Sequence, residues 1–150
     1  MMCRAMGPCI AHCDEIFGKT LRVEGKDKNM KRAFTIFEYL YRDSSNYKVW
    51  GKLRLVGIAS PKIEADLRAC LESEELFVAE QVGVPVLYGE LWSLSNGPTS
   101  DDHAYHEFVL LRPSTADEDL SIPISGSLSI LLETFQKAQQ CWNCSLSANA

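Results

Sequence analysis

Two neighbouring segments rich in aromatic and β-branched residues constrain the fold more than any other feature of the chain. Residues 33–42 contain the run Phe-Thr-Ile-Phe-Glu-Tyr-Leu-Tyr, and in residues 47–57 apolar positions alternate with Trp50 and basic residues. Such runs favour strands, and alternation is typical of a strand with one face in water. Because the residues from Asp43 to Asn46 favour turns, the sequence predicts a β-hairpin.

Helical periodicity follows the hairpin. Ser60 suits an N-cap, and Pro61 suits the first helical position, where its missing N–H costs nothing. Four apolar residues then recur at helical spacing on one face: Ile63, Leu67, Cys70 and Leu71. This pattern predicts a helix that buries one stripe.

The rest of the chain alternates between strand-like and helix-like segments. The patterns predict strands at 76–82 and 103–112, a long loop at 85–102 with one helical turn near 88–92, a solvated linker at 114–119 and a helix at 127–142. The order is ββαββα. It predicts an α+β domain with a mainly antiparallel sheet of about four strands and both helices on one face.

The domain is predicted to occupy residues 30–144, followed by a frayed tail at 145–150. Residues 1–29 show neither alternation nor a helical stripe, and the sequence changes character at Met30. Our hypothesis is that residues 1–29 are a non-native or disordered extension of the domain.

Charge and composition exclude several classes of protein. The chain has 150 residues and a formal net charge of −5, so it lacks the basic surplus of a dedicated nucleic-acid binder. No unbroken apolar stretch is long enough for a membrane helix, and no motif for a phosphate loop, a dinucleotide fold or a nucleophile elbow occurs. We therefore expect neither nucleic-acid nor membrane partners.

The first candidate site is a polar cluster at the start of the predicted strand 103–112. Asp102, His103, His106 and Glu107 carry side chains that can bind zinc, iron or manganese. Strand alternation sends His103 and Glu107 to one face and His106 to the other, so the histidines diverge. The pattern favours residues that tie down the preceding loop. A metal-dependent hydrolase is the alternative, with a divalent metal as its cofactor; otherwise no cofactor is predicted.

The second candidate site surrounds the hairpin turn. Tyrosine, tryptophan and arginine are enriched at binding hot spots, and several occur here with polar turn residues. The candidates for binding a ligand or partner are Tyr41, Arg42, Asp43, Asn46, Tyr47 and Trp50. Trp92 and His103 in the 85–107 segment, and Glu80 at the end of a predicted strand, are added because they could face the same cleft. The alternative is a turn closed by Asp43 and Asn46 without a ligand.

Three sequence blocks together resemble a family of small uncharacterised bacterial proteins. The blocks are YRDSSNYKVWG at 41–51, EQVGVPVLYGELW at 80–92 and GPTSDDHAYHEFV at 97–109. The family has no agreed activity, so the resemblance implies a bacterial cytoplasmic setting and a start near Met30, but no mechanism.

The leading hypothesis is a small acidic binding or accessory module, and the metal-dependent hydrolase is the alternative. It would recognise a protein or a small-molecule ligand where the 41–50 hairpin meets the 85–107 loop. A third hypothesis is a scaffold or homodimer subunit without a site, which would pair through the first strand if that strand lay at a sheet edge.

Overall fold

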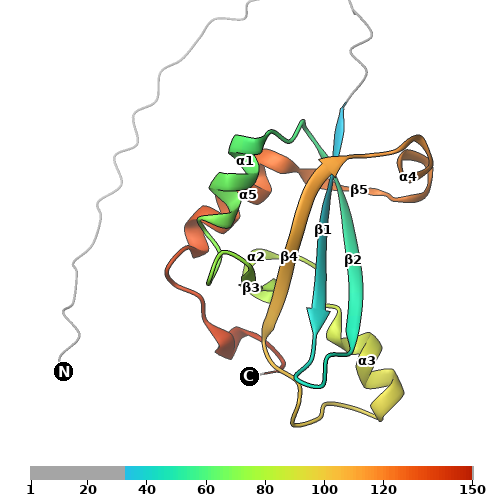
Figure 1. Cartoon of the computed structure of the whole chain (residues 1–150), viewed down its shortest axis with the longest axis vertical. Helices are drawn as coiled ribbons and strands as arrows, with labels where there is room; N and C mark the ends of the chain where they lie inside the picture. The colour runs from blue at the N-terminus through green and yellow to red at the C-terminus, as the bar shows by residue number, and fades with distance from the viewer. Residues whose placement is uncertain (1–32, 150) are drawn as a thin grey trace, which may run out of the picture. The chain divides into compact units, whose positions relative to one another are not determined.

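A computed structural model describes residues 33–149, shown in Figure 1. The predicted extension at 1–29 lies outside the described residues. The described strands are β1 (Phe34–Arg42), β2 (Lys48–Val56), β3 (Leu76–Val78), β4 (Tyr105–Pro113) and β5 (Ile124–Ser127). The helices are α1 (Pro61–Arg68), α2 (Ala79–Val82), α3 (Tyr88–Ser95), α4 (Ala116–Ser121), α5 (Leu128–Ala138) and the short 3-10 helix η1 (Cys144–Leu146). The predicted α+β class is confirmed.

The sheet is built around the predicted hairpin. β1 and β2 pair antiparallel from Phe34 opposite Val56 to Arg42 opposite Lys48. The turn is closed because Asp43 accepts the Asn46 backbone N–H, and Asn46 has the left-handed φ of 70° that asparagine tolerates. The hairpin prediction is confirmed.

The sheet has more strands than the sequence predicts, and they are mixed in direction. Their order is β3-β4-β1-β2-β5, with β5 parallel to β2 and the other pairs antiparallel. The predicted sheet of about four mainly antiparallel strands is thus present, with β5 added to it as a parallel strand. β1 lies in the interior of the sheet, so it is no edge strand through which a homodimer could pair.

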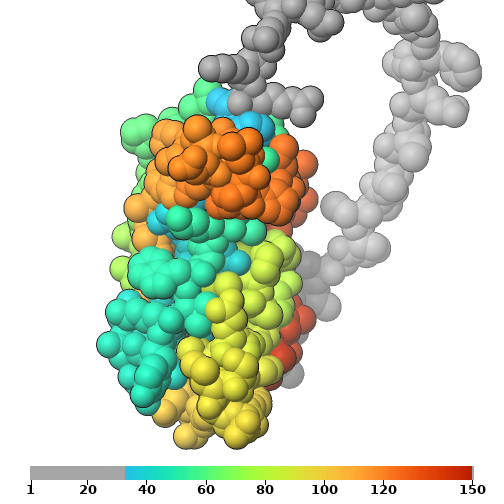
Figure 2. All heavy atoms as spheres, turned by 90° about the vertical axis from the view of Figure 1, so that its right-hand side faces the viewer, coloured from blue at the N-terminus to red at the C-terminus, as the bar shows by residue number. Residues whose placement is uncertain are grey.

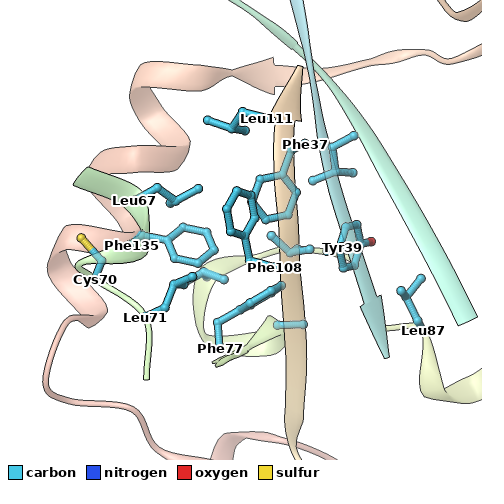
Figure 3. Close-up of a cluster of buried hydrophobic side chains, with 14 of the residues drawn as sticks. Phe37, Tyr39, Leu67, Cys70, Leu71, Phe77, Leu87, Phe108, Leu111 and Phe135 are labelled. Atoms are coloured by element: carbon cyan, nitrogen blue, oxygen red, sulfur yellow. The ribbon is translucent and has the colours of Figure 1, made fainter. Parts of the chain in front are cut away.

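The core lies between one face of the sheet and the helices α1 and α5 (Figure 3). Phe37 of β1 and Phe108 of β4 pack against each other with ring centroids 5.3 Å apart. Phe135 of α5 is fully buried and contacts Phe37 and Phe77. The stripe predicted for this helix also faces the core: Leu67 of α1 is buried, and so are Cys70 and Leu71, which lie just after the helix ends at Arg68. Apolar burial of this kind is the main source of the domain's stability.

Several predicted boundaries shift for identifiable reasons. The strand predicted at 76–82 ends at Val78, and residues 79–82 form α2, which Gly83 ends with a left-handed φ of 68°. The strand predicted at 103–112 begins at Tyr105. The helix predicted at 127–142 ends at Ala138, because Gln139 has a non-helical ψ of 131°.

Two helices occupy segments predicted as a loop and a linker. α3 is two turns long where one turn was predicted, and it ends at Asn96 with a left-handed φ of 62°. α4 replaces the linker predicted at 114–119. Thr115 and Glu118 form a capping box at its start, in which each side chain bonds the other residue's backbone N–H.

α4 contacts the face of the sheet opposite α1 and α5. Arg112 of β4 bridges Glu38 of β1 and Glu118 of α4, with nitrogen–oxygen distances of 2.6 and 2.5 Å. Lys52 lies 3.2 Å from Glu118. The contact with Arg112 holds the pKa of Glu118 well below its usual range. Ion pairs, not apolar packing, therefore attach this helix to the sheet. In the part of the chain that the structure describes, no helix is long and apolar enough to cross a membrane.

Candidate functional site

The hairpin turn and the loop after α3 are joined by hydrogen bonds. The backbone N–H of Ser44 donates to the Asp101 carbonyl at 2.9 Å, and the Ser45 hydroxyl donates to the Asp101 carboxylate at 2.5 Å. In Figure 2 the hairpin end of the sheet lies directly beside the yellow segment that contains α3. The predicted meeting place of these two segments is thus present in the structure.

Asp102 fastens this meeting place to the core. One carboxylate oxygen accepts the Tyr41 hydroxyl at 2.7 Å. The other accepts the indole N–H of Trp92 at 3.1 Å and the backbone N–H of Thr99 at 2.8 Å. Burial alone would raise the pKa of Asp102, but these bonds together outweigh it and hold the pKa below the ordinary value. The residue is an ionised anchor.

Tyr41 is the buried partner of this anchor. Its side chain is fully buried on β1, and its hydroxyl also accepts the backbone N–H of His103 at 3.1 Å. Burial and the bond to Asp102 raise the pKa of Tyr41 well above its usual value. The Tyr41 hydroxyl therefore stays protonated, and its hydrogen bonds to Asp102 and His103 hold the loop against β1.

A pocket of about 330 Å³ opens between the hairpin turn and α3. This volume is at the lower end of the range for small-ligand pockets. Its walls combine carboxylates, serine and threonine hydroxyls and apolar side chains. The carboxylates and apolar walls belong to Asp43, Asp101, Asp102, Tyr47, Leu91 and Leu94. We call this the hairpin pocket.

The hairpin pocket has an acidic lining. Within the described residues, its walls contain three aspartates but no lysine or arginine. Asp43 uses one oxygen to accept the Tyr47 backbone N–H at 2.9 Å, and Asp101 uses one for Ser45. Tyr47 is 66% exposed and Leu94 is 82% exposed, so the rim offers apolar surface to an incoming group. The arrangement suits a positive charge carried on an apolar stem.

The structure divides the predicted hairpin residues between two faces. Asp43 and Tyr47 line the pocket, whereas strand alternation places Arg42 and Trp50 on the opposite face of the sheet. There Arg42 pairs with Glu107 at 2.9 Å. Asn46 accepts a bond from Arg42 at 3.2 Å and does not line the pocket. The hairpin residues predicted to form one binding surface therefore lie on two opposite faces of the sheet.

Glu80 and His103 lie away from the pocket. Glu80 of α2 accepts the Tyr88 hydroxyl at 2.5 Å and the Ser147 hydroxyl at 2.8 Å. The carbonyl of His103 accepts the side-chain amide of Asn149. The contacts of Ser147 and Asn149 belong to the tail predicted at 145–150 to be frayed, so this tail is bonded to the domain.

His106 is a core residue. Its ring is fully buried among Tyr39, Tyr41 and Phe77, and its Nε2 accepts the Leu87 backbone N–H at 3.0 Å. Burial lowers the pKa of His106 to about 4. The imidazole is therefore neutral near pH 7 and holds the chain at the start of α3.

The four predicted metal-ligand residues have separate partners. Asp102 bonds Tyr41 and Trp92, and His106 bonds Leu87. His103 accepts the Tyr105 backbone N–H through Nδ1, and Glu107 pairs with Arg42 on the far face. Among residues 33–149, no group of three or more histidine, cysteine, aspartate or glutamate side chains is placed to hold a metal ion. The loop-anchoring role favoured from the sequence describes Asp102 well. The metal-dependent hydrolase stays a prediction.

The sequence patterns did not identify the apolar wall of the pocket. Leu91 and Leu94 line it from α3, and Thr99 and Ser95 add hydroxyls. An available signal was the i, i+3 spacing of Leu91 and Leu94, which places both leucines on one face of a helix. In comparisons with known proteins, no family model, no curated protein and no solved structure matches this chain.

Proposed function

We propose that this chain is a small binding module and that the hairpin pocket is its ligand site. The observation that carries the proposal is the pocket itself, which lies where the 41–50 hairpin meets the segment 85–107. Binding residues commonly lie in connections that a rigid scaffold positions. Here β1, β2 and α3 supply the scaffold.

The chemistry of the lining selects the class of ligand. The aspartates favour a cation, and the spare oxygens of Asp43 and Asp101 can accept its N–H groups. Leu91, Leu94 and the Tyr47 ring can cover an apolar stem. A lysine side chain of a partner protein, or a small alkyl amine, has this combination of charge and stem.

The test compares two probes of equal length by NMR titration of the labelled protein. Nα-acetyl-lysine methylamide should shift amide signals in residues 43–47 and 91–102, with a dissociation constant on the order of millimolar, which corresponds to roughly 4 kcal/mol. The norleucine analogue, which has the stem without the charge, should shift them much less. Raising the salt concentration should weaken binding of the lysine probe.

Variants locate the site. Asp43→Asn and Tyr47→Ala should each weaken binding of the lysine probe, because they remove a charge and a wall of the pocket. Trp50→Ala is the matched control, since this aromatic residue of the same hairpin lies on the opposite sheet face. Equal binding of both probes, or loss of binding only in Trp50→Ala, would refute the proposal.

A further inference from the structure

The last residues of the chain are held against the domain like a bound peptide. After α5, residues 139–149 run along the domain toward α2, seen as the red segment that leads to the C-terminus in Figure 1. Gln140 has a left-handed φ of 61° at the junction with the helix. This conformation is unfavourable for glutamine, so the backbone is strained where the tail leaves the helix.

The side chain of Gln81 binds the backbone of the tail. Its side-chain amide donates to the Cys141 carbonyl at 3.0 Å and accepts the Asn143 backbone N–H at 2.9 Å. A strand in a sheet offers a neighbour the same pair of bonds. Because both bonds go to the backbone, Gln81 can hold a segment of different sequence in the same way.

Trp142 is the anchor side chain of the tail. Its indole N–H donates to the Cys70 carbonyl at 3.1 Å. Its ring lies edge-on to Phe135, with centroids 5.9 Å apart. A single aromatic anchor beside backbone bonds is typical of peptide recognition.

The far end of the tail covers Glu80. One Glu80 oxygen accepts the Ser147 hydroxyl at 2.8 Å and the Ala148 backbone N–H at 3.3 Å. The other oxygen, Oε2, is buried without a hydrogen-bond partner among the described residues, and so is Oδ1 of Asn149. The tail thus leaves Glu80 Oε2 unsatisfied and buries an unsatisfied acceptor of its own, Asn149 Oδ1. A better-fitting segment would satisfy the first and lack the second.

Most of the tail is exposed. Cys141, Asn143, Ser145 and Ala148 are exposed, and Leu146 is 53% exposed. Segments with little buried apolar surface open at low cost in free energy. The tail therefore has the features of a replaceable ligand.

We propose that the surface under the tail is a docking site for a peptide segment of a partner protein. This tail-binding surface consists of Cys70, Glu80, Gln81, His103 and Phe135. The partner segment carries an aromatic residue and, five residues later, a hydroxyl donor, followed by a basic residue that satisfies Glu80. A second copy of this chain is a poorer occupant, because its tail would leave the same Glu80 oxygen unsatisfied.

The experiment uses the full chain and a fluorescent peptide with the sequence of residues 139–149, under reducing conditions. Trp142→Ala weakens the attachment of the chain's own tail, so this variant should bind the peptide. Binding is measured by fluorescence anisotropy. Wild type should bind it at least about tenfold more weakly, because its own tail competes at high effective concentration. Asn143→Pro, which removes a backbone donor of the exposed tail, is the second variant should Trp142→Ala fail to fold.

Controls separate the surface from nonspecific binding. Adding Gln81→Ala to Trp142→Ala should weaken binding of the peptide, whereas adding Gln136→Ala, at an exposed glutamine of α5, should not. A peptide with alanine in place of the tryptophan should not bind. If both tail variants are folded by circular dichroism and neither binds the peptide, the tail is a fixed part of the domain and the proposal is wrong.

A second peptide tests the partner chemistry. Replacing the asparagine of the peptide that corresponds to Asn149 with arginine removes the unsatisfied Oδ1 acceptor and places a cation one residue after Ala148, whose backbone N–H bonds Glu80. It should bind Trp142→Ala at least about threefold more tightly than the native sequence. Equal or weaker binding would leave the tail of a second copy as the better occupant and overturn the assignment to a partner protein.

Discussion

Replacing Asp102 with asparagine tests whether this residue is the ionised anchor of the hairpin pocket. The substitution keeps the size of the side chain and removes its charge. In the native protein the carboxylate accepts the Tyr41 hydroxyl, the Trp92 indole N–H and the Thr99 backbone N–H. The single oxygen of an asparagine can accept from Tyr41 or from the Trp92 and Thr99 donors, while its amide nitrogen faces the remaining donor or donors and cannot accept from them.

The expected cost follows from these bonds. A hydrogen bond to a charged group contributes roughly 1 kcal/mol more than a neutral one, and Asp102 makes three such bonds in a half-buried position. Discounting for partial exposure, we expect Asp102→Asn to lower the free energy of unfolding by about 2 kcal/mol. For a domain of this size, the melting temperature should fall by roughly 7 °C.

The dependence on pH has a definite sign. Because the folded-state pKa of Asp102 lies below the ordinary value of 3.8, its stabilising effect is present above about pH 4 and is lost as the pH falls through the folded-state value. The difference in stability between wild type and Asp102→Asn should therefore be largest near pH 7 and shrink in acid.

The assay is urea unfolding followed by circular dichroism at pH 7 and pH 3. Asp101→Asn is the matched control. Among residues 33–149 the Asp101 side chain bonds only the exposed Ser45 hydroxyl, so this substitution should cost less than about 0.5 kcal/mol. If Asp102→Asn costs no more than Asp101→Asn at pH 7, Asp102 is not the anchor that its contacts indicate.

Two further predictions concern the core. Gly51→Ala would place a Cβ atom 2.6 Å from Cζ of the buried Tyr39 ring, so it should destabilise the domain by about 1 to 3 kcal/mol. The control is Gly89→Ala in α3, whose Cβ would meet no atom of the described residues within 4 Å, so it should be neutral or stabilising in thermal unfolding. Destabilisation by Gly89→Ala alone would contradict this packing. Since folding lowers the pKa of His106 from 6.5 to about 4, the unfolded state binds the extra proton, and this residue should make stability rise by roughly 3 kcal/mol from pH 4 to pH 6.5. His106→Phe should flatten that rise in urea unfolding across the window, and an unchanged slope would show that the imidazole is not the titrating group.

The hairpin and α1 could be predicted because their signals are local. The turn from Asp43 to Asn46 fixes the register of β1 and β2, and Ser60 caps α1 through its own side chain. The capping box of Thr115 and Glu118 was equally local, so α4 was readable from the sequence. β5 was not, because an exposed Ile-Ser-Gly-Ser segment acquires its extended shape only by pairing with β2.

The contact between the hairpin and the 85–107 segment could be predicted, but the division of the hairpin side chains between two faces was missed. Neighbours in the sequence were grouped into one surface, yet strand alternation sends Arg42 and Trp50 to the opposite face from Tyr41 and Tyr47. The same rule that separated the histidines would have separated these residues. The role of Asp102 depended on Tyr41 and Trp92, which lie 61 and 10 positions away, and no sequence spacing encodes those contacts.

α3 connects the two candidate surfaces. Tyr88 and Trp92 are four residues apart and lie on one face of the helix, with ring centroids 4.7 Å apart. The Tyr88 hydroxyl bonds Glu80, which holds the tail, and the Trp92 indole bonds Asp102, which supports the hairpin pocket. Because this aromatic pair supports both acidic anchors, replacing Tyr88 or Trp92 should disturb the tail and the pocket together. Substitutions away from the pair, in the tail, at Gln81 or in the hairpin turn, can distinguish the two proposed binding sites.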